Sequence, residues 1–91
     1  MPLAPQRVTK RFQRAFKKKP PNQQARISKC LRQLREGGPP YHPGLHTHKV
    51  QGHPTAWEAY VDGANRVTFE RDGEWVVLRN NCKHDMPGQN P

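Results

Sequence analysis

The protein has 91 residues, with 16 Lys or Arg against 7 Asp or Glu, a formal net charge of +9 and 32% hydrophobic residues. This length is enough for one small domain and too short for a second core, and no apolar run approaches the roughly 20 residues of a membrane helix. The first ten residues contain no apolar stretch of the signal-peptide type. We therefore expect one domain over residues 1–91, with disordered tails at 1–6 and 87–91, located in the cytoplasm.

The charge is concentrated in the first part of the chain. Residues 1–36 hold 11 of the 16 cations and a single acid, Glu36, whereas residues 37–91 hold six acids and five cations. Such asymmetry indicates a polyanion or an acidic protein as the partner.

A helical period begins at Arg7, because apolar side chains recur at spacings of three and four: Val8, Phe12, Ala15 and Phe16. Basic side chains follow the same period on a second stripe: Arg7, Arg11, Arg14 and Lys18. Pro20-Pro21 ends this helix, and a second helix is expected from Pro21 or Asn22 to the Gly37-Gly38 stop. The short turn between them predicts an antiparallel helical hairpin.

The remainder of the chain has the alternating pattern of strands. The runs 57–61, 66–70 and 75–78 are separated by Asp62-Gly63 and Asp72-Gly73, and Asp-Gly between alternating runs is a strong hairpin signal. Residues 45–50 are a further candidate strand. The sequence predicts an α+β fold in which the helical hairpin packs on one face of a three- to four-stranded antiparallel meander. Trp57, Val61, Val67 and Phe69 are expected to face the helices.

Two cysteines, Cys30 and Cys82, lie far apart and match no zinc-ribbon or redox spacing, so we expect two reduced thiols. A zinc site built from His46 and His48 with Cys82 or His84 is an alternative use of the histidines, but the spacings fit no common site. We expect no metal and no cofactor.

The five histidines bring proton-transfer chemistry to a polar sheet face. RNA cleavage by transesterification requires a base for the 2′-hydroxyl, fixed cations for the phosphorane and an acid for the 5′-oxygen, and it needs no metal. His84 is a candidate acid. Candidate bases or helpers of the base are His48, Tyr60 and Asp62. Candidate phosphate-binding cations are Lys49, Arg66 and Lys83.

The succession of two helices and a meander resembles the RelE/ParE superfamily of bacterial toxin–antitoxin toxins. The matching segments are Phe12-x3-Phe16-Lys-Lys-Lys-Pro, the 27–34 helix, His48-Lys49-Val50-Gln51-Gly52, Arg66-Val67-Thr68-Phe69 and Cys82-Lys83-His84-Asp85. Together they cover about residues 7–86. The histidine at His48 is similar to the YafQ-like branch, and His84 occupies the place of the family's terminal catalytic Arg or His. In contrast to several members, residues 86–91 offer no aromatic side chain.

The resemblance implies a ribosome-dependent endoribonuclease that cuts mRNA in the 30S A site, a cognate antitoxin as partner, and operator DNA bound only through that antitoxin. Catalytic candidates are then His84, His48, Arg66, Lys83, Tyr60 and Asp62. Candidate RNA-binding residues are Lys49, Arg11, Arg14, Lys17, Lys18 and Lys19. Two alternatives remain open: a gyrase-inhibiting toxin on the same fold, and a basic nucleic-acid-binding or ribosome-associated protein without enzymatic activity.

Overall fold

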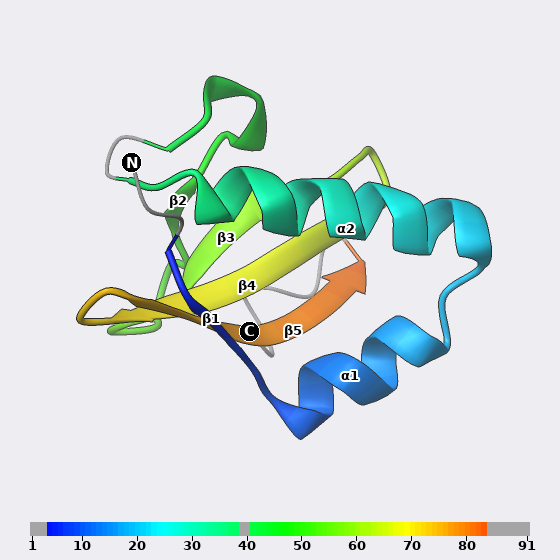
Figure 1. The fold of residues 1–91 in the computed structure, drawn as a ribbon, viewed down its shortest axis with the longest axis horizontal. Coiled ribbons are helices and arrows are strands. Elements are labelled where there is room, and N and C mark those ends of the chain that lie inside the picture. The colour runs from blue at the N-terminus through cyan, green and yellow to red at the C-terminus, as the bar shows by residue number, and fades with distance from the viewer. Residues whose placement is uncertain (1–3, 39–40, 84–91) are drawn as a thin grey trace.

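A computed structural model describes residues 4–38 and 41–83. It contains two helices, a short 3-10 turn and a five-stranded sheet (Figure 1). In chain order the elements are β1 (Gln6–Val8), α1 (Lys10–Lys17), α2 (Pro21–Arg35), η1 (Pro43–Leu45), β2 (His48–Lys49), β3 (Trp57–Tyr60), β4 (Asn65–Asp72) and β5 (Trp75–Lys83). The α+β prediction is confirmed, with differences at the N-terminus and in the number of strands.

The first helix begins at Lys10 rather than at Arg7, because Thr9 caps it. The Thr9 hydroxyl accepts a hydrogen bond from the Phe12 N–H at 3.2 Å and donates one to the Leu78 carbonyl at 2.8 Å. Residues before the cap are therefore extended, and Gln6–Val8 pairs in parallel with β5. The prediction of a frayed end through residue 6 was wrong at Gln6, since this pairing with a distant strand leaves no local sequence signal.

The sheet has the order β1-β5-β4-β3-β2, and all neighbours except β1 and β5 are antiparallel. The predicted meander is thus present, and β1 makes the sheet mixed. The expected strand over residues 45–50 is reduced to His48–Lys49, because Leu45 ends a 3-10 turn and is buried in the core.

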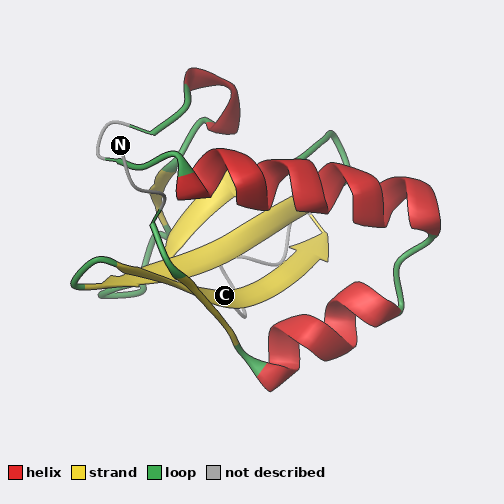
Figure 2. Ribbon diagram, viewed as in Figure 1, coloured by secondary structure: helices red, strands yellow, loops and turns green. Residues whose placement is uncertain are grey.

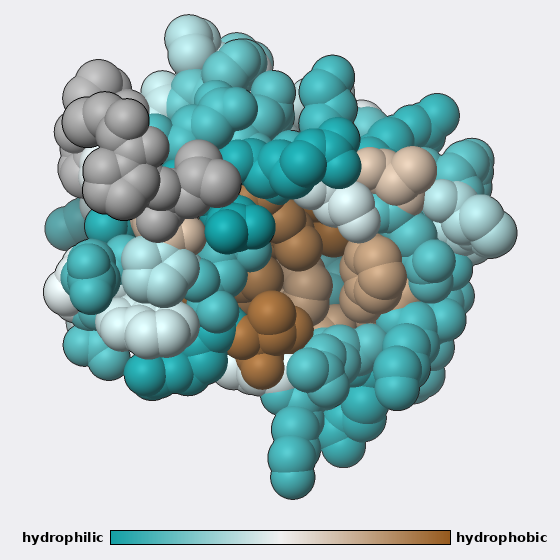
Figure 3. Space-filling model, viewed as in Figure 1, coloured by the Kyte–Doolittle hydropathy of each residue, from teal (hydrophilic) through white to brown (hydrophobic). Residues whose placement is uncertain are grey.

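Helix α2 crosses one face of the sheet, and α1 lies along β5 (Figure 2). The core between these layers contains Phe12, Ile27, Leu34, Val67, Phe69 and Leu78, all almost completely buried. Trp57 and Val61 are only partly buried against it. Figure 3 shows further apolar side chains gathered between the two helices, with hydrophilic side chains around them.

An irregularity in the pairing of β4 with β5 changes which side chains of β5 face the helices. Phe69 pairs with Leu78 but Thr68 pairs with Asn80, so Arg79 is an extra residue of the bulge type. After it, Asn81 points to the helix side, where its side-chain amide donates to the Phe12 carbonyl at 2.9 Å. Cys82 is directed to the opposite face together with its partner Arg66.

Candidate functional site

Four polar side chains come together on the sheet face that α2 does not cover. Three of them are candidates from the sequence, and the fourth, Glu58, lies beside them. The register pairs His48 with Glu58 and Tyr60 with Arg66, so β2, β3 and β4 each contribute to one group. We call this group the Glu58 cluster, and its members are His48, Glu58, Tyr60 and Arg66.

Arg66 is held from several sides. Its Nε lies 3.3 Å from Glu58 Oε1, its Nη1 donates to the backbone carbonyls of Asp62 and Asn65, and its guanidinium lies 4.7 Å from the Tyr60 ring centroid. Only 19% of the Arg66 side chain is exposed. A guanidinium fixed in this way loses little freedom when it binds an anion with its remaining N–H groups.

His48 lies between two oxygen atoms. Its Nδ1 is 3.0 Å from the His46 carbonyl, and its Nε2 is 3.3 Å from Glu58 Oε2. A carbonyl and a carboxylate both accept hydrogen bonds, so only a ring with protons on both nitrogens complements both partners. Glu58 is therefore placed to exchange a proton with the His48 ring.

Asp62 lies in the β3–β4 turn and has a different role from the cluster. Its carboxylate accepts hydrogen bonds from the Ala64 and Asn65 N–H groups at 2.9 and 2.8 Å and from Arg26 at 3.3 Å. Partial burial alone would raise the pKa of Asp62, but these hydrogen bonds outweigh it and hold the pKa below its ordinary value. A carboxylate of lowered pKa and fully occupied oxygens suits the anchoring of a turn better than proton abstraction.

The candidate residues near the end of the sheet are more dispersed. Lys83 is the last residue of β5 and pairs with Asn65, so it points to the helix side rather than toward Arg66. Lys49 is exposed and lies 5.7 Å from the Trp57 ring centroid. His84, the candidate acid, lies outside the described residues.

Four basic side chains, from α1 and from the two lysines that follow it, line one hollow of about 520 Å³ between α1 and β5. We call it the α1 groove, and its lining residues are Arg11, Arg14, Ala15, Lys18, Lys19 and Asn80. It contains no acidic side chain. Lys17 is exposed and is not part of this lining. Arg7 was predicted on the same helical stripe, but it lies in β1, and its guanidinium is 5.3 Å from the Trp75 ring centroid.

The main residue that sequence reasoning missed is Glu58. The alternation of its strand places it on the outward face, but its contact with both His48 and Arg66 depends on pairing with two other strands. The same is true of Glu70, which binds Arg79 at 2.8 Å and accepts a hydrogen bond from the Thr55 hydroxyl.

Neither cysteine belongs to the cluster. Cys30 and Cys82 are buried thiols, and burial raises the pKa of the Cys30 thiol to about 12. Within the described ranges 4–38 and 41–83, no three His, Cys, Asp or Glu side chains are grouped so that they could hold a metal ion. Nor does that part of the chain include a helix of the length and apolar character needed to span a membrane.

The fold is that of RelE-type toxins. A mutant toxin of Helicobacter pylori in a copper-bound form is similar over 90% of this chain and 96% of its own, with a TM-score of 0.71 and 15% identity. The RelBE2 toxin–antitoxin complex of Mycobacterium tuberculosis matches over 92% and 100%, with a TM-score of 0.70 and 19% identity. YafQ of Escherichia coli matches over 87% and 91%, with a TM-score of 0.64 and 12% identity. No family model and no curated protein matches the sequence.

Proposed function

We propose that this protein is the toxin of a toxin–antitoxin pair and acts as a ribosome-dependent mRNA endoribonuclease. The observation that carries the proposal is the Glu58 cluster, in which a fixed guanidinium and an imidazole share one carboxylate on an open sheet face. The likeness of the fold to RelE and YafQ toxins supports the proposal, since several of those proteins have structures described as toxin–antitoxin complexes.

The proposed reaction is an internal transesterification. The 2′-oxygen forms a bond to phosphorus, the bond from phosphorus to the 5′-oxygen breaks, and the products carry a 2′,3′-cyclic phosphate and a 5′-hydroxyl. Arg66 stabilises the charge on the phosphorane through its remaining N–H groups. His84 protonates the departing oxygen, and Lys83 precedes it in the chain as a supporting cation.

The His48–Glu58 pair takes the proton of the 2′-hydroxyl. Because the carboxylate lies 3.3 Å from Nε2, the pair accepts one proton in the cleavage step and releases it afterwards. Tyr60 supports Arg66 through its ring, and His46 supports Tyr60 by an edge contact at 5.8 Å. Asp62 serves the reaction by anchoring the turn whose carbonyl binds Arg66.

The α1 groove and Lys49 bind RNA phosphates of the ribosome and of the message. Grouped surface cations attract nucleic acid with little dependence on sequence and with a strong dependence on salt. An acidic antitoxin is the expected protein partner for a chain with net charge +9, and it alone would bind operator DNA.

The test is 5′-end mapping of cellular mRNA after brief induction of the wild-type chain, of His84→Ala and of the control Arg32→Ala, a charge change on the exposed part of α2. We expect new ends within translated frames in the wild type and the control, and none in His84→Ala. Intact message together with DNA damage would favour the gyrase-inhibiting alternative. Benign expression with intact message would favour a binding protein.

A further inference from the structure

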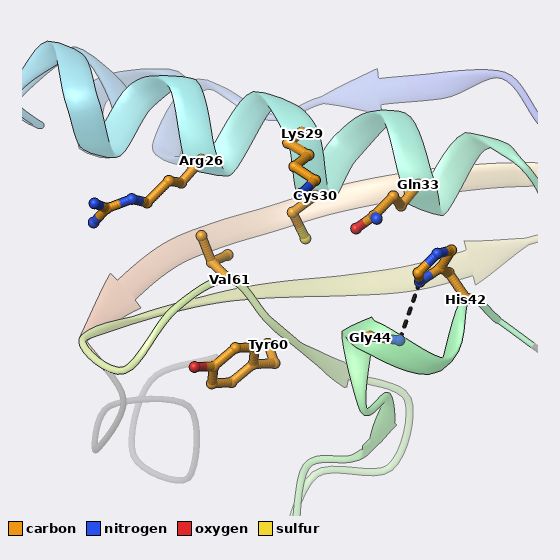
Figure 4. A pocket seen from close by; sticks show the side chains of 8 residues that line it. All are labelled: Arg26, Lys29, Cys30, Gln33, His42, Gly44, Tyr60 and Val61. Carbon is orange, nitrogen blue, oxygen red and sulfur yellow. Dashed lines mark hydrogen bonds between the residues drawn. The ribbon is translucent and has the colours of Figure 1, made fainter.

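A second cavity lies beside the Glu58 cluster and has no role in the reaction above. It has a volume of about 290 Å³ and is enclosed by α2, η1 and the end of β3 (Figure 4). Tyr60 belongs to both the Glu58 cluster and this cavity, because it lines the cavity and its ring also stacks with Arg66. We call it the α2 pocket. Tyr60 thus joins the α2 pocket to the sheet face that carries the Glu58 cluster.

The floor of the α2 pocket is apolar and partly aromatic. Cys30 reaches down from α2, and Val61 and the Tyr60 ring lie opposite to it (Figure 4). Because the pKa of the Cys30 thiol is raised to about 12, the sulfur is neutral at physiological pH. Single-stranded RNA is read by proteins that stack its bases on aromatic rings and bind their edges with polar side chains. A flat base therefore fits this floor.

The polar groups around the pocket are mostly donors. Lys29 is exposed and carries donors only, and Gln33 on the next turn of α2 carries both an amide donor and an acceptor. His42 faces them from η1, and its Nδ1 accepts a hydrogen bond from the Gly44 N–H at 3.0 Å. The proton of the neutral His42 ring is then on Nε2, which makes this nitrogen a further donor. Arg26 adds positive charge at the rim but is paired with Asp62.

We propose that the α2 pocket binds a guanine base adjacent to the cleaved phosphate, and this proposal rests on the endoribonuclease function. Guanine presents two neighbouring acceptors, O6 and N7, to which Lys is a common partner. Adenine places its N6 amino donor in the position of O6, where it would meet the donors of Lys29 and His42. Lys29 and His42 bind the O6–N7 edge, and Gln33 binds a second polar group of the base.

The first experiment measures cleavage preference in the mapped 5′ ends. We expect guanine to be enriched at one fixed position next to the cut, and Gln33→Ala and Lys29→Ala each to reduce that enrichment about tenfold. Gln23→Ala, on the same helix outside the pocket, is the matched control and keeps the wild-type preference. Cutting without guanine enrichment, or enrichment unchanged in both variants, overturns the guanine assignment while leaving the nuclease function intact.

The second experiment does not depend on cleavage. In an NMR titration of the whole wild-type chain, guanosine 5′-monophosphate should shift the Gln33 side-chain amide and the Gly44 backbone signal at concentrations about tenfold lower than adenosine 5′-monophosphate. Equal shifts with inorganic phosphate would make the pocket an anion site and overturn the proposal. Absent shifts would overturn it also, whether or not the chain cuts RNA.

Discussion

The Glu58 cluster and the α1 groove both carry basic side chains, but they are built in opposite ways. In the cluster each charge has a partner, since Glu58 lies 3.3 Å from both Arg66 and His48, and the side chains of Arg66 and Glu58 are mostly buried. In the α1 groove, two arginines of α1 and the two lysines that follow it line an open hollow whose lining contains no acid. A paired, half-buried guanidinium is fixed in direction, whereas grouped surface cations retain freedom and produce a long-range field.

The two surfaces therefore suit different tasks. The cluster is suited to a directional task, the stabilisation of charge on one reacting phosphate. The groove is suited to attraction of a polyanion regardless of its sequence. Changes in the cluster should therefore alter the rate after binding, and changes in the groove should alter the binding and its dependence on salt.

The largest effect is expected from Arg66→Ala. Removal of a fixed charge donor that acts in the transition state costs about 10²–10³ in rate, and this variant also leaves Glu58 without its guanidinium partner. We expect loss of growth arrest and at least this reduction in cutting of programmed ribosomes, with ribosome affinity within a factor of about three. Arg32→Ala, an exposed arginine on α2, is the control. Retention of full toxicity in Arg66→Ala would remove the cluster from the reaction.

The same contrast explains which parts of the molecule were readable from the sequence. The second helix was predicted to begin at Pro21 or Asn22, and it begins at Pro21, because proline and the double glycine act locally on the backbone. The strands of the meander were predicted for the same reason. The first strand was missed because Gln6–Val8 is defined by its pairing with β5, and the bulge at Arg79 changes the alternation of β5 without any Gly or Pro to mark it.

The candidate site was predictable to a similar degree. Arg66, Tyr60 and His48 were singled out from alternation and resemblance, and strand pairing brings them together. Glu58 was missed as a partner because its two contacts join three strands. Asp62 was grouped with Tyr60 by alternation, but the strand ends at Tyr60 and the Asp62 carboxylate binds its own turn. Local pattern thus identifies residue types on a face, whereas register decides which of them touch.

The next largest effect concerns the α1 groove. The double variant Arg14→Ala/Lys18→Ala should weaken binding to ribosomes, and the slope of log K against log salt should fall by about 0.7–0.9 per charge removed. Arg32→Ala/Arg35→Ala on α2 removes the same net charge elsewhere and should change the slope less. Binding is measured between 50 and 200 mM salt, the range over which the electrostatic contribution changes most. Equal slopes for the two double variants would mean that net charge alone matters.

A smaller effect is expected from Glu58→Gln, and it distinguishes Glu58 from Glu70, a second carboxylate on the sheet face that α2 does not cover. Glu58→Gln keeps the shape of the side chain but removes the charge that holds Arg66 and His48, so we expect cutting to fall about 10- to 150-fold, as a charge-assisted hydrogen bond contributes roughly 1.5–3 kcal/mol. Glu70→Gln is the matched control, because Glu70 binds Arg79 in a similar way outside the cluster. The pH profile of cutting should change in Glu58→Gln only. Equal losses in both variants would indicate a general effect on the sheet face.

The smallest effect tests whether Asp62 is structural. The hydrogen bonds from Ala64, Asn65 and Arg26 lower the pKa of Asp62 in the folded chain relative to its ordinary value of 3.8, so the carboxylate stabilises the fold at pH values above 3.8. That stabilisation is lost as the pH falls through the folded pKa, because the protonated group no longer accepts these bonds as an anion. Urea unfolding at pH 7 and at progressively lower pH should show a smaller acid-induced loss of stability in Asp62→Asn than in the wild type. Asp72→Asn, whose carboxylate is exposed and lies 3.8 Å from Arg7, should retain the wild-type acid dependence. If Asp62→Asn instead abolishes cutting at neutral pH while its unfolding curve is unchanged, Asp62 takes part in the reaction, and the division between turn and cluster is wrong.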